Sequence, residues 1–171
     1  MFPTSAATIS TNPPDSYLHE SARQFLDCVN RAAEFCWSDD SYTECVTANS
    51  TARDALYDEL RDETDLIANL VQEAIRRAVQ ATKGCVERWK QGKRVSQPEF
   101  TSRSMLYDKR SATFYRDRVS LSTVNGRVKG DFELPADSLT PYERYVLSED
   151  VEQDVIWTVP HPRGCPQLYG T

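Results

Sequence analysis

The sequence predicts an α+β protein in which a helical domain is followed by a small, incomplete antiparallel β-barrel. Two changes of pattern along the 171 residues predict this order. Up to about Lys90, apolar residues recur at steps of three and four, which is the period of a helix. Beyond Pro98 the period falls to two, and the dipeptide Asn125-Gly126 marks a hairpin.

The first helix is predicted over Ser16–Cys36, because a single apolar stripe runs along its whole length. Asp15 or Ser16 can cap its first turn by accepting a hydrogen bond from a backbone N–H. The stripe consists of Leu18, Ala22, Phe25, Leu26, Val29, Ala33 and Cys36. Acidic residues on the opposite side, Glu20, Asp27 and Glu34, predict that the outer face of this helix is solvated.

Residues 38–50 are polar and mixed, which indicates a loop, and a short helix is predicted over Thr51–Arg61. Its apolar members are Ala55, Leu56 and Leu60, with Tyr57 alongside. A helix of this length is not stable alone and must pack on its neighbours.

The third helix is predicted over Asp65–Lys90, with an apolar stripe made of Ile67, Leu70, Val71, Ala74, Ala78, Cys85 and Trp89. Gly84 costs about 1 kcal/mol relative to alanine inside a helix, and it either permits a close helix contact or marks a weak point. Gln91-Gly92-Lys93 is the predicted helix end.

Four strands are predicted in the second half, at 104–107, 112–115, 118–122 and 127–134. Both Asn125 and Gly126 tolerate positive φ in the hairpin turn, an irregularity is expected at Gly130, and Pro135 ends the run. Residues 151–171 show no sustained period, so we expect a poorly packed tail anchored only by Ile156 and Trp157. The predicted domains are a helical one at 15–92 and a β domain at 93–150. Residues 1–14 are expected to be disordered or a remnant strand, and residues 151–171 an irregular tail.

The charge is distributed unevenly. The chain has a net charge of −6, yet residues 76–118 carry 12 basic and 4 acidic residues. Arg76, Lys83 and Lys90 repeat every seven residues, opposite the apolar stripe, and form a basic ridge on the third helix. Two interpretations stay open: these are solvated faces, or the segment binds a polyanion. The candidate nucleic-acid-binding residues are Arg76, Lys83, Lys90, Lys93, Arg94, Arg103, Lys109 and Arg110.

Aromatic residues are interleaved with these cations, namely Trp89, Phe100, Tyr107, Phe114 and Tyr115. A mixture of this kind is typical of surfaces that neutralise phosphates and stack bases. For each aromatic residue taken alone, a place in the core is the better interpretation.

No motif in the sequence predicts a catalytic centre or a metal site. The two histidines, His19 and His161, stand outside any motif. The five cysteines have no Cys-x-x-Cys spacing and are predicted to be free thiols. The acidic run Asp58, Glu59, Asp62, Glu63 and Asp65 is interpreted as a solvated surface rather than a metal site. With no apolar run long enough to span a bilayer and no secretory signal, we expect a cytoplasmic protein.

The segment from about Leu18 to Asp150 resembles the N-terminal half of TnpB (OrfB-type) proteins. Five runs carry this resemblance: NLVQEAIRRAV, CVERWK, PEFTS, YDKRSATFY and VSLSTVNGRV. TnpB proteins are encoded by insertion sequences, were long called transposases, and act as RNA-guided DNA endonucleases. The resemblance implies a helical recognition lobe and a wedge-like β-barrel of oligonucleotide-binding type, which grip guide RNA and the RNA–DNA duplex through the backbone.

The chain also departs from the TnpB pattern. That family cleaves DNA with a RuvC-like fold that holds divalent metal, into which a zinc element is inserted, and neither part is present in this sequence. The family also begins with a basic strand, of which residues 1–14 are at best a remnant. We therefore expect a truncated member without nuclease activity or a cofactor of its own. Three hypotheses remain open: a nucleic-acid-binding remnant, a split half that assembles with a separately encoded nuclease part, and a decayed, non-functional fragment.

Overall fold

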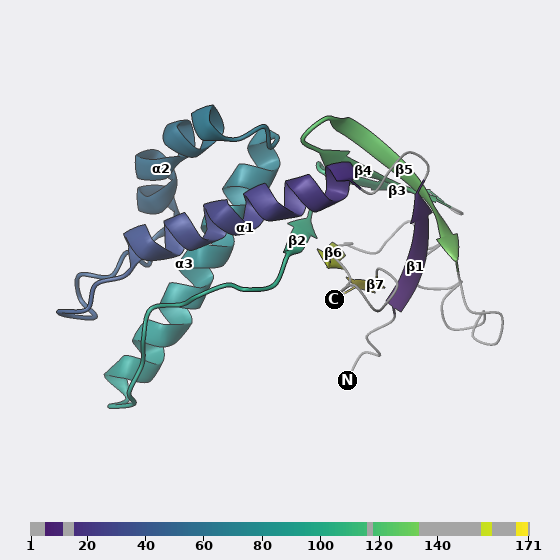
Figure 1. Cartoon of the computed structure of the whole chain (residues 1–171). Coiled ribbons are helices and arrows are strands. Elements are labelled where there is room, and N and C mark those ends of the chain that lie inside the picture. Colours follow the sequence, from purple (N-terminus) through teal and green to yellow (C-terminus); the bar gives the residue numbers. More distant parts are fainter. Residues whose placement is uncertain (1–5, 12–15, 116–117, 134–154, 159–166, 171) are drawn as a thin grey trace. The chain divides into compact units, whose positions relative to one another are not determined.

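The computed structural model of the protein describes residues 6–11, 16–115, 118–133, 155–158 and 167–170 (Figure 1). The chain divides into two compact units, one made of residues 23–102 and the other of residues 1–22 together with 103–171. The first is helical, and the second contains the sheet and the first turns of α1. These boundaries differ from the predicted helical domain at 15–92 and β domain at 93–150. The α+β class is confirmed.

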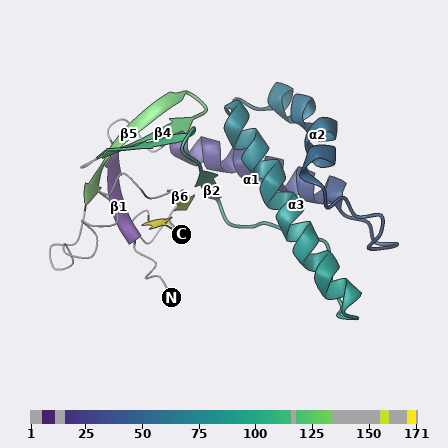
Figure 2. The same ribbon diagram turned by 180° about the vertical axis from the view of Figure 1, so that it is seen from behind.

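The helical unit is built from α1 (Ser16–Cys36), α2 (Asn49–Glu63) and α3 (Ala68–Lys90). In Figures 1 and 2, α1 crosses α3, and α2 packs against α3. The bounds of α1 are those that its apolar stripe predicts. Buried members of this stripe include Phe25, Val29 and Cys36, while Leu26 is only half-buried.

Two details of the other helices correct the predictions. In α2 the buried positions are Ala52, Leu56 and Leu60, a regular four-residue repeat, whereas Ala55 is exposed. Helix α3 begins three residues later than predicted. The side chain of Gln24 accepts a hydrogen bond from the backbone N–H of Asp65 (2.9 Å), which holds this residue outside the helix.

The sheet contains seven strands among the described residues, in the order β2-β6-β7-β1-β5-β4-β3, and all neighbours are antiparallel. Their bounds are β1 Ala6–Thr11, β2 Ser104–Tyr107, β3 Ala112–Phe114, β4 Arg118–Thr123, β5 Gly126–Glu133, β6 Val155–Thr158 and β7 Gln167–Gly170. Strands β2 and β3 are the two edges, so the sheet is open and does not close into a barrel.

The tail prediction is wrong for two segments. Strand β6 pairs with β2 and with β7, and β7 also pairs with β1, so residues 155–158 and 167–170 are internal strands of the sheet. Four-residue strands are too short to show a period of their own, and their partners lie far away in the sequence. Within residues 1–14, residues 6–11 form strand β1.

The hairpin between β4 and β5 forms where the Asn125-Gly126 dipeptide predicts it, but with a different turn. Among the described residues only glycines have positive φ, and Gly126 has φ +87°. This pattern matches a turn followed by a left-handed glycine rather than two consecutive left-handed residues. The pairing continues regularly through Val119–Gly130, so the expected irregularity at Gly130 is absent.

The sheet unit has a small core of its own. Tyr107 is fully buried, and its hydroxyl donates a hydrogen bond to the backbone carbonyl of Ser122 at 2.9 Å. Other buried apolar side chains of this unit are Leu18, Ala22, Met105, Ala112, Val119, Leu121 and Val128. Ser21 Oγ accepts a hydrogen bond from the backbone N–H of Val124 (2.9 Å), which ties the first turns of α1 to the hairpin.

The two interpretations of Gly84 lead to opposite expectations for a substitution to alanine. A Cβ atom at Gly84 would meet no atom within 4 Å, so no close helix contact requires this glycine. We therefore expect Gly84→Ala to raise the free energy of unfolding by about 1 kcal/mol, measured by chemical denaturation. The control is Gly92→Ala, where φ is +75°, and we expect it to lower stability by about 1–2 kcal/mol. A destabilised Gly84→Ala protein would contradict this interpretation.

Candidate nucleic-acid interface

The basic ridge lies on the exposed side of α3. Arg76, Lys83 and Lys90 are all exposed, whereas Ala74 and Ala78 on the opposite side of the helix are fully buried. Seven residues are close to two helical turns, so successive cations are about 10 Å apart along the helix axis. The core packing of α3 therefore sets which way the ridge faces.

Two of the three ridge cations form ion pairs within α3, and the third does not. Arg76 pairs with the buried Glu73 at 3.0 Å, and Lys90 pairs with Glu87 at 3.0 Å. Lys83 makes no ion pair with any residue that the structure describes. A phosphate approaching the ridge would compete with carboxylates at both ends and with none at Lys83.

The end of α3 brings two further candidates next to the ridge. The backbone N–H of Lys93 donates to the carbonyl of Arg88 (3.1 Å), and that of Gly92 donates to the carbonyl of Trp89 (2.8 Å). This is a Schellman motif, and its left-handed residue is Gly92. It places Lys93 directly after the last turn of the helix, and the side chains of Lys93 and Arg94 are exposed.

The other three candidates belong to the sheet unit. Arg103 precedes β2, and Lys109 and Arg110 occupy the turn between β2 and β3, where all three are exposed. Asp108 Oδ1 orders this turn by accepting hydrogen bonds from the N–H groups of Arg110 and Ser111 and from Ser111 Oγ, each at 2.9 Å. Partial burial acts to raise the pKa of Asp108, but these hydrogen bonds outweigh it and hold the pKa below its usual value.

Two of the interleaved aromatic residues in the helical unit have protein partners. Trp89 stacks on Trp37 with ring centroids 5.6 Å apart, and it packs edge to face with Tyr42 with ring centroids 6.0 Å apart. The guanidinium of Arg77 lies over the Phe100 ring at 5.2 Å, and burial lowers the pKa of Arg77 although Glu73 opposes the shift. Both rings are therefore engaged in packing.

In the sheet unit, Tyr107 is buried in the core, and Tyr115 is 44% exposed. Of the interleaved aromatic residues whose exposure the structure describes, Tyr115 has the most open ring. The side chain of Phe114 lies outside the described side chains.

Two members of the acidic run, Glu59 and Glu63, take part in a structural contact. Arg31 on α1 forms ion pairs with both Glu59 and Glu63. Among the described residues, no group of three or more histidine, cysteine or acidic side chains is arranged to hold a metal ion.

Four of the cysteines, Cys28, Cys36, Cys45 and Cys85, are free and buried, as the spacing predicts, and Cys165 lies outside the described residues. Burial raises the pKa of the Cys28 and Cys36 thiols to about 11. Both are therefore protonated near neutral pH and are poor nucleophiles.

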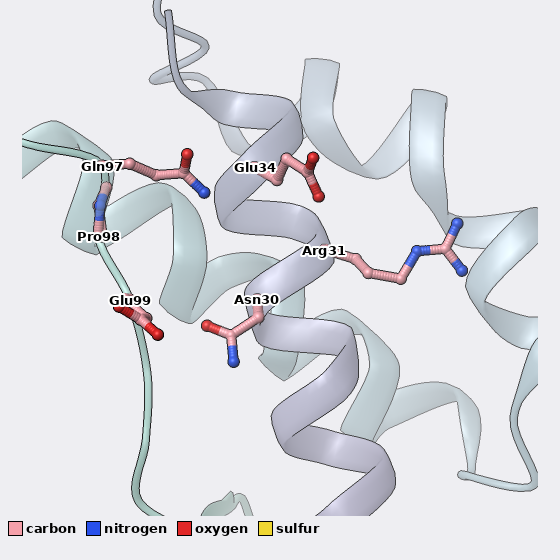
Figure 3. A pocket seen from close by; sticks show the side chains of 6 residues that line it. All are labelled: Asn30, Arg31, Glu34, Gln97, Pro98 and Glu99. Atoms are coloured by element: carbon pink, nitrogen blue, oxygen red, sulfur yellow. The ribbon is translucent and has the colours of Figure 1, made fainter. Parts of the chain in front are cut away.

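An open pocket lies between α1 and the segment that follows α3 (Figure 3). Its lining residues are Asn30, Arg31, Glu34, Gln97, Pro98 and Glu99. The Asn30 amide is already used, because it donates to the carbonyl of Phe100 (2.8 Å) and accepts from its N–H (2.9 Å). In Figure 3 the Arg31 side chain extends away from Gln97 and Glu99. This pocket is better explained as the place where Asn30 fastens the connecting segment to α1.

In the described part of the sheet unit, three exposed cations are not among the predicted candidates, namely Arg118, Arg127 and Lys129. The alternation in G-R-V-K-G puts Arg127 and Lys129 on one side of their strand, so the period of two was the signal available for finding these two residues.

Neither a scan against protein-family models nor a search of curated proteins finds a match to this chain. In the part of the chain that the structure describes, no helix is long and apolar enough to cross a membrane.

Proposed function

We propose that this chain binds the phosphate backbone of a structured RNA or an RNA–DNA duplex through the end of α3. The observation that carries the proposal is the group Lys83, Lys93 and Arg94, whose exposed positive charges pair with no carboxylate among the described residues. Polyanions bind such surfaces by releasing counterions, whatever the net charge of the whole protein.

The resemblance to TnpB proteins supports the choice of ligand. In that family a recognition lobe and a wedge domain hold guide RNA and its duplex with DNA through the backbone, leaving sequence recognition to base pairing. We therefore propose a TnpB-like, transposon-encoded RNA-binding protein whose contacts do not depend on base identity.

Salt dependence provides the test. Lys83→Gln/Lys93→Gln should flatten the slope of log K against log [salt] for a structured RNA hairpin by roughly 1.4–1.8 units, since each phosphate contact contributes 0.7–0.9. Fluorescence anisotropy on the full chain measures this slope. The melting temperature should stay almost unchanged, because exposed charges contribute little to folding.

The matched control is Arg23→Gln/Arg53→Gln, which removes the same charge from the same unit. Both residues are exposed and ion-paired, Arg23 to Asp27 at 3.0 Å and Arg53 to Asp54 at 3.3 Å. We expect this control to keep the parental slope. The proposal fails if the parent does not bind RNA, or if the two double variants behave alike.

A further inference from the structure

The hairpin of β4 and β5 carries a second positively charged surface, separate from the basic ridge. Strand pairing places Arg127 opposite Ser122, Lys129 opposite Ser120, and Arg118 opposite Asp131. Residues directly opposite in a sheet share a face, so these six side chains lie on one side of the hairpin. Val119, Leu121 and Val128 lie on the other side and are buried in the core. On the polar side Ser120 and Ser122 are also buried, whereas Arg118, Arg127 and Lys129 are exposed.

Arg127 is held in place without being neutralised. Its Nε donates to Ser120 Oγ (3.1 Å), and its Nη2 donates to Thr113 Oγ1 (2.8 Å) and to the carbonyl of Ser120 (3.3 Å). All three acceptors are neutral, and Arg127 forms no ion pair with any described residue. The result is an exposed guanidinium whose position is fixed and whose charge is left available.

Two further cations and one aromatic ring extend this surface. Lys129 is exposed two residues along the strand, about 7 Å from Arg127. The guanidinium of Arg118 lies 5.0 Å from the ring centroid of the exposed Tyr115. Asp131 faces Arg118 across the strands, so the excess positive charge is centred on Arg127 and Lys129.

We propose that this face of the hairpin binds single-stranded nucleic acid, with phosphates on Arg127, Lys129 and Arg118 and a base stacked on Tyr115. A row of cations beside an open aromatic ring is the combination that binds single strands with little sequence preference. The proposal shares with the proposed function only the class of ligand. It concerns a different surface, on the other unit, and unpaired rather than duplex nucleic acid.

The test uses the full chain with the ridge weakened by Lys83→Gln/Lys93→Gln, so that binding at the hairpin face can be seen alone. The probes are short oligomers of thymidine and of uridine, which separate DNA from RNA. We expect this protein to bind at least one oligomer, with backbone amide shifts at Thr113, Ser120 and Arg127. Adding Arg118→Gln/Lys129→Gln should flatten the salt slope by about 1.4 units, at 0.7 per contact for single strands. Tyr115→Leu should weaken binding about fivefold or more.

Arg127 is left intact in these variants because its hydrogen bonds join β3, β4 and β5. Adding Arg23→Gln/Arg53→Gln instead should leave the oligomer slope unchanged. The inference is overturned if the ridge-weakened protein binds neither oligomer, or if the hairpin variant keeps the slope of this control. Either result can occur while the structured hairpin RNA still binds the parent, so failure of this inference is distinguishable from failure of the proposed function.

Discussion

Phe25→Ala should lower the free energy of unfolding by about 3–5 kcal/mol, which is the range expected for removing a buried aromatic ring. Phe25 lies on α1 and has an exposed fraction of 0%. Since the ring is enclosed on all sides, its removal loses the transfer free energy of the side chain and also leaves a cavity. Equilibrium denaturation in urea measures the change.

The same helix offers a matched control for this substitution. Phe35 also lies on α1, but its side chain is 41% exposed. We expect Phe35→Ala to change stability by no more than about 0.5 kcal/mol, as is usual for surface positions. If the two variants lost equal stability, the buried stripe of α1 could not face the core as described.

Deleting residues 151–171 should destabilise the sheet unit strongly. Strand β2 pairs only with β6 in the described sheet, so the deletion removes the hydrogen-bonded partner of the strand that carries Met105 and Tyr107. Several backbone hydrogen bonds at about 0.5–1.5 kcal/mol each give a loss of at least about 3 kcal/mol. For a chain of this size that corresponds to a fall in melting temperature of about 6–12 °C.

A point substitution separates loss of pairing from loss of chain length. Ile156 lies in β6 opposite Leu106. Ile156→Pro removes a backbone donor and should reproduce much of the thermal shift, whereas Ile156→Val should cause little change. An unchanged melting temperature after both the deletion and Ile156→Pro would favour the sequence-based expectation of a poorly packed tail.

Long, regular segments could be predicted from the sequence because their signal is local. The stripe of α1 repeats over 21 residues, and its helix begins and ends where the stripe does. The same reasoning predicts that Lys83 is exposed, since it lies opposite the buried side of α3. Glycines at the end of α3 and in the β4–β5 hairpin likewise mark those turns, because few other residues adopt positive φ.

Contacts between distant segments could not be predicted in this way. Whether Trp89 faces a ligand or stacks on Trp37 depends on a residue more than fifty positions away. Strands β6 and β7 pair with each other, and their other partners are β2 for β6 and β1 for β7. Four residues of alternating pattern carry too little information to identify such partners.

The same distinction between local sequence signals and contacts between distant segments applies to the candidate nucleic-acid surfaces. Composition by itself determined that basic residues are concentrated in residues 76–118, and the helical period determined that α3 has a basic, solvent-exposed side. Only the tertiary structure decided which of those cations keep their charge available, because Glu73 and Glu87 neutralise the two ends of the ridge. It also decided that Arg118 shares the face of Arg127 and Lys129. A shift of one residue in strand pairing would have sent Arg118 to the opposite side from these two, and register is set by core packing and turn geometry rather than by charge.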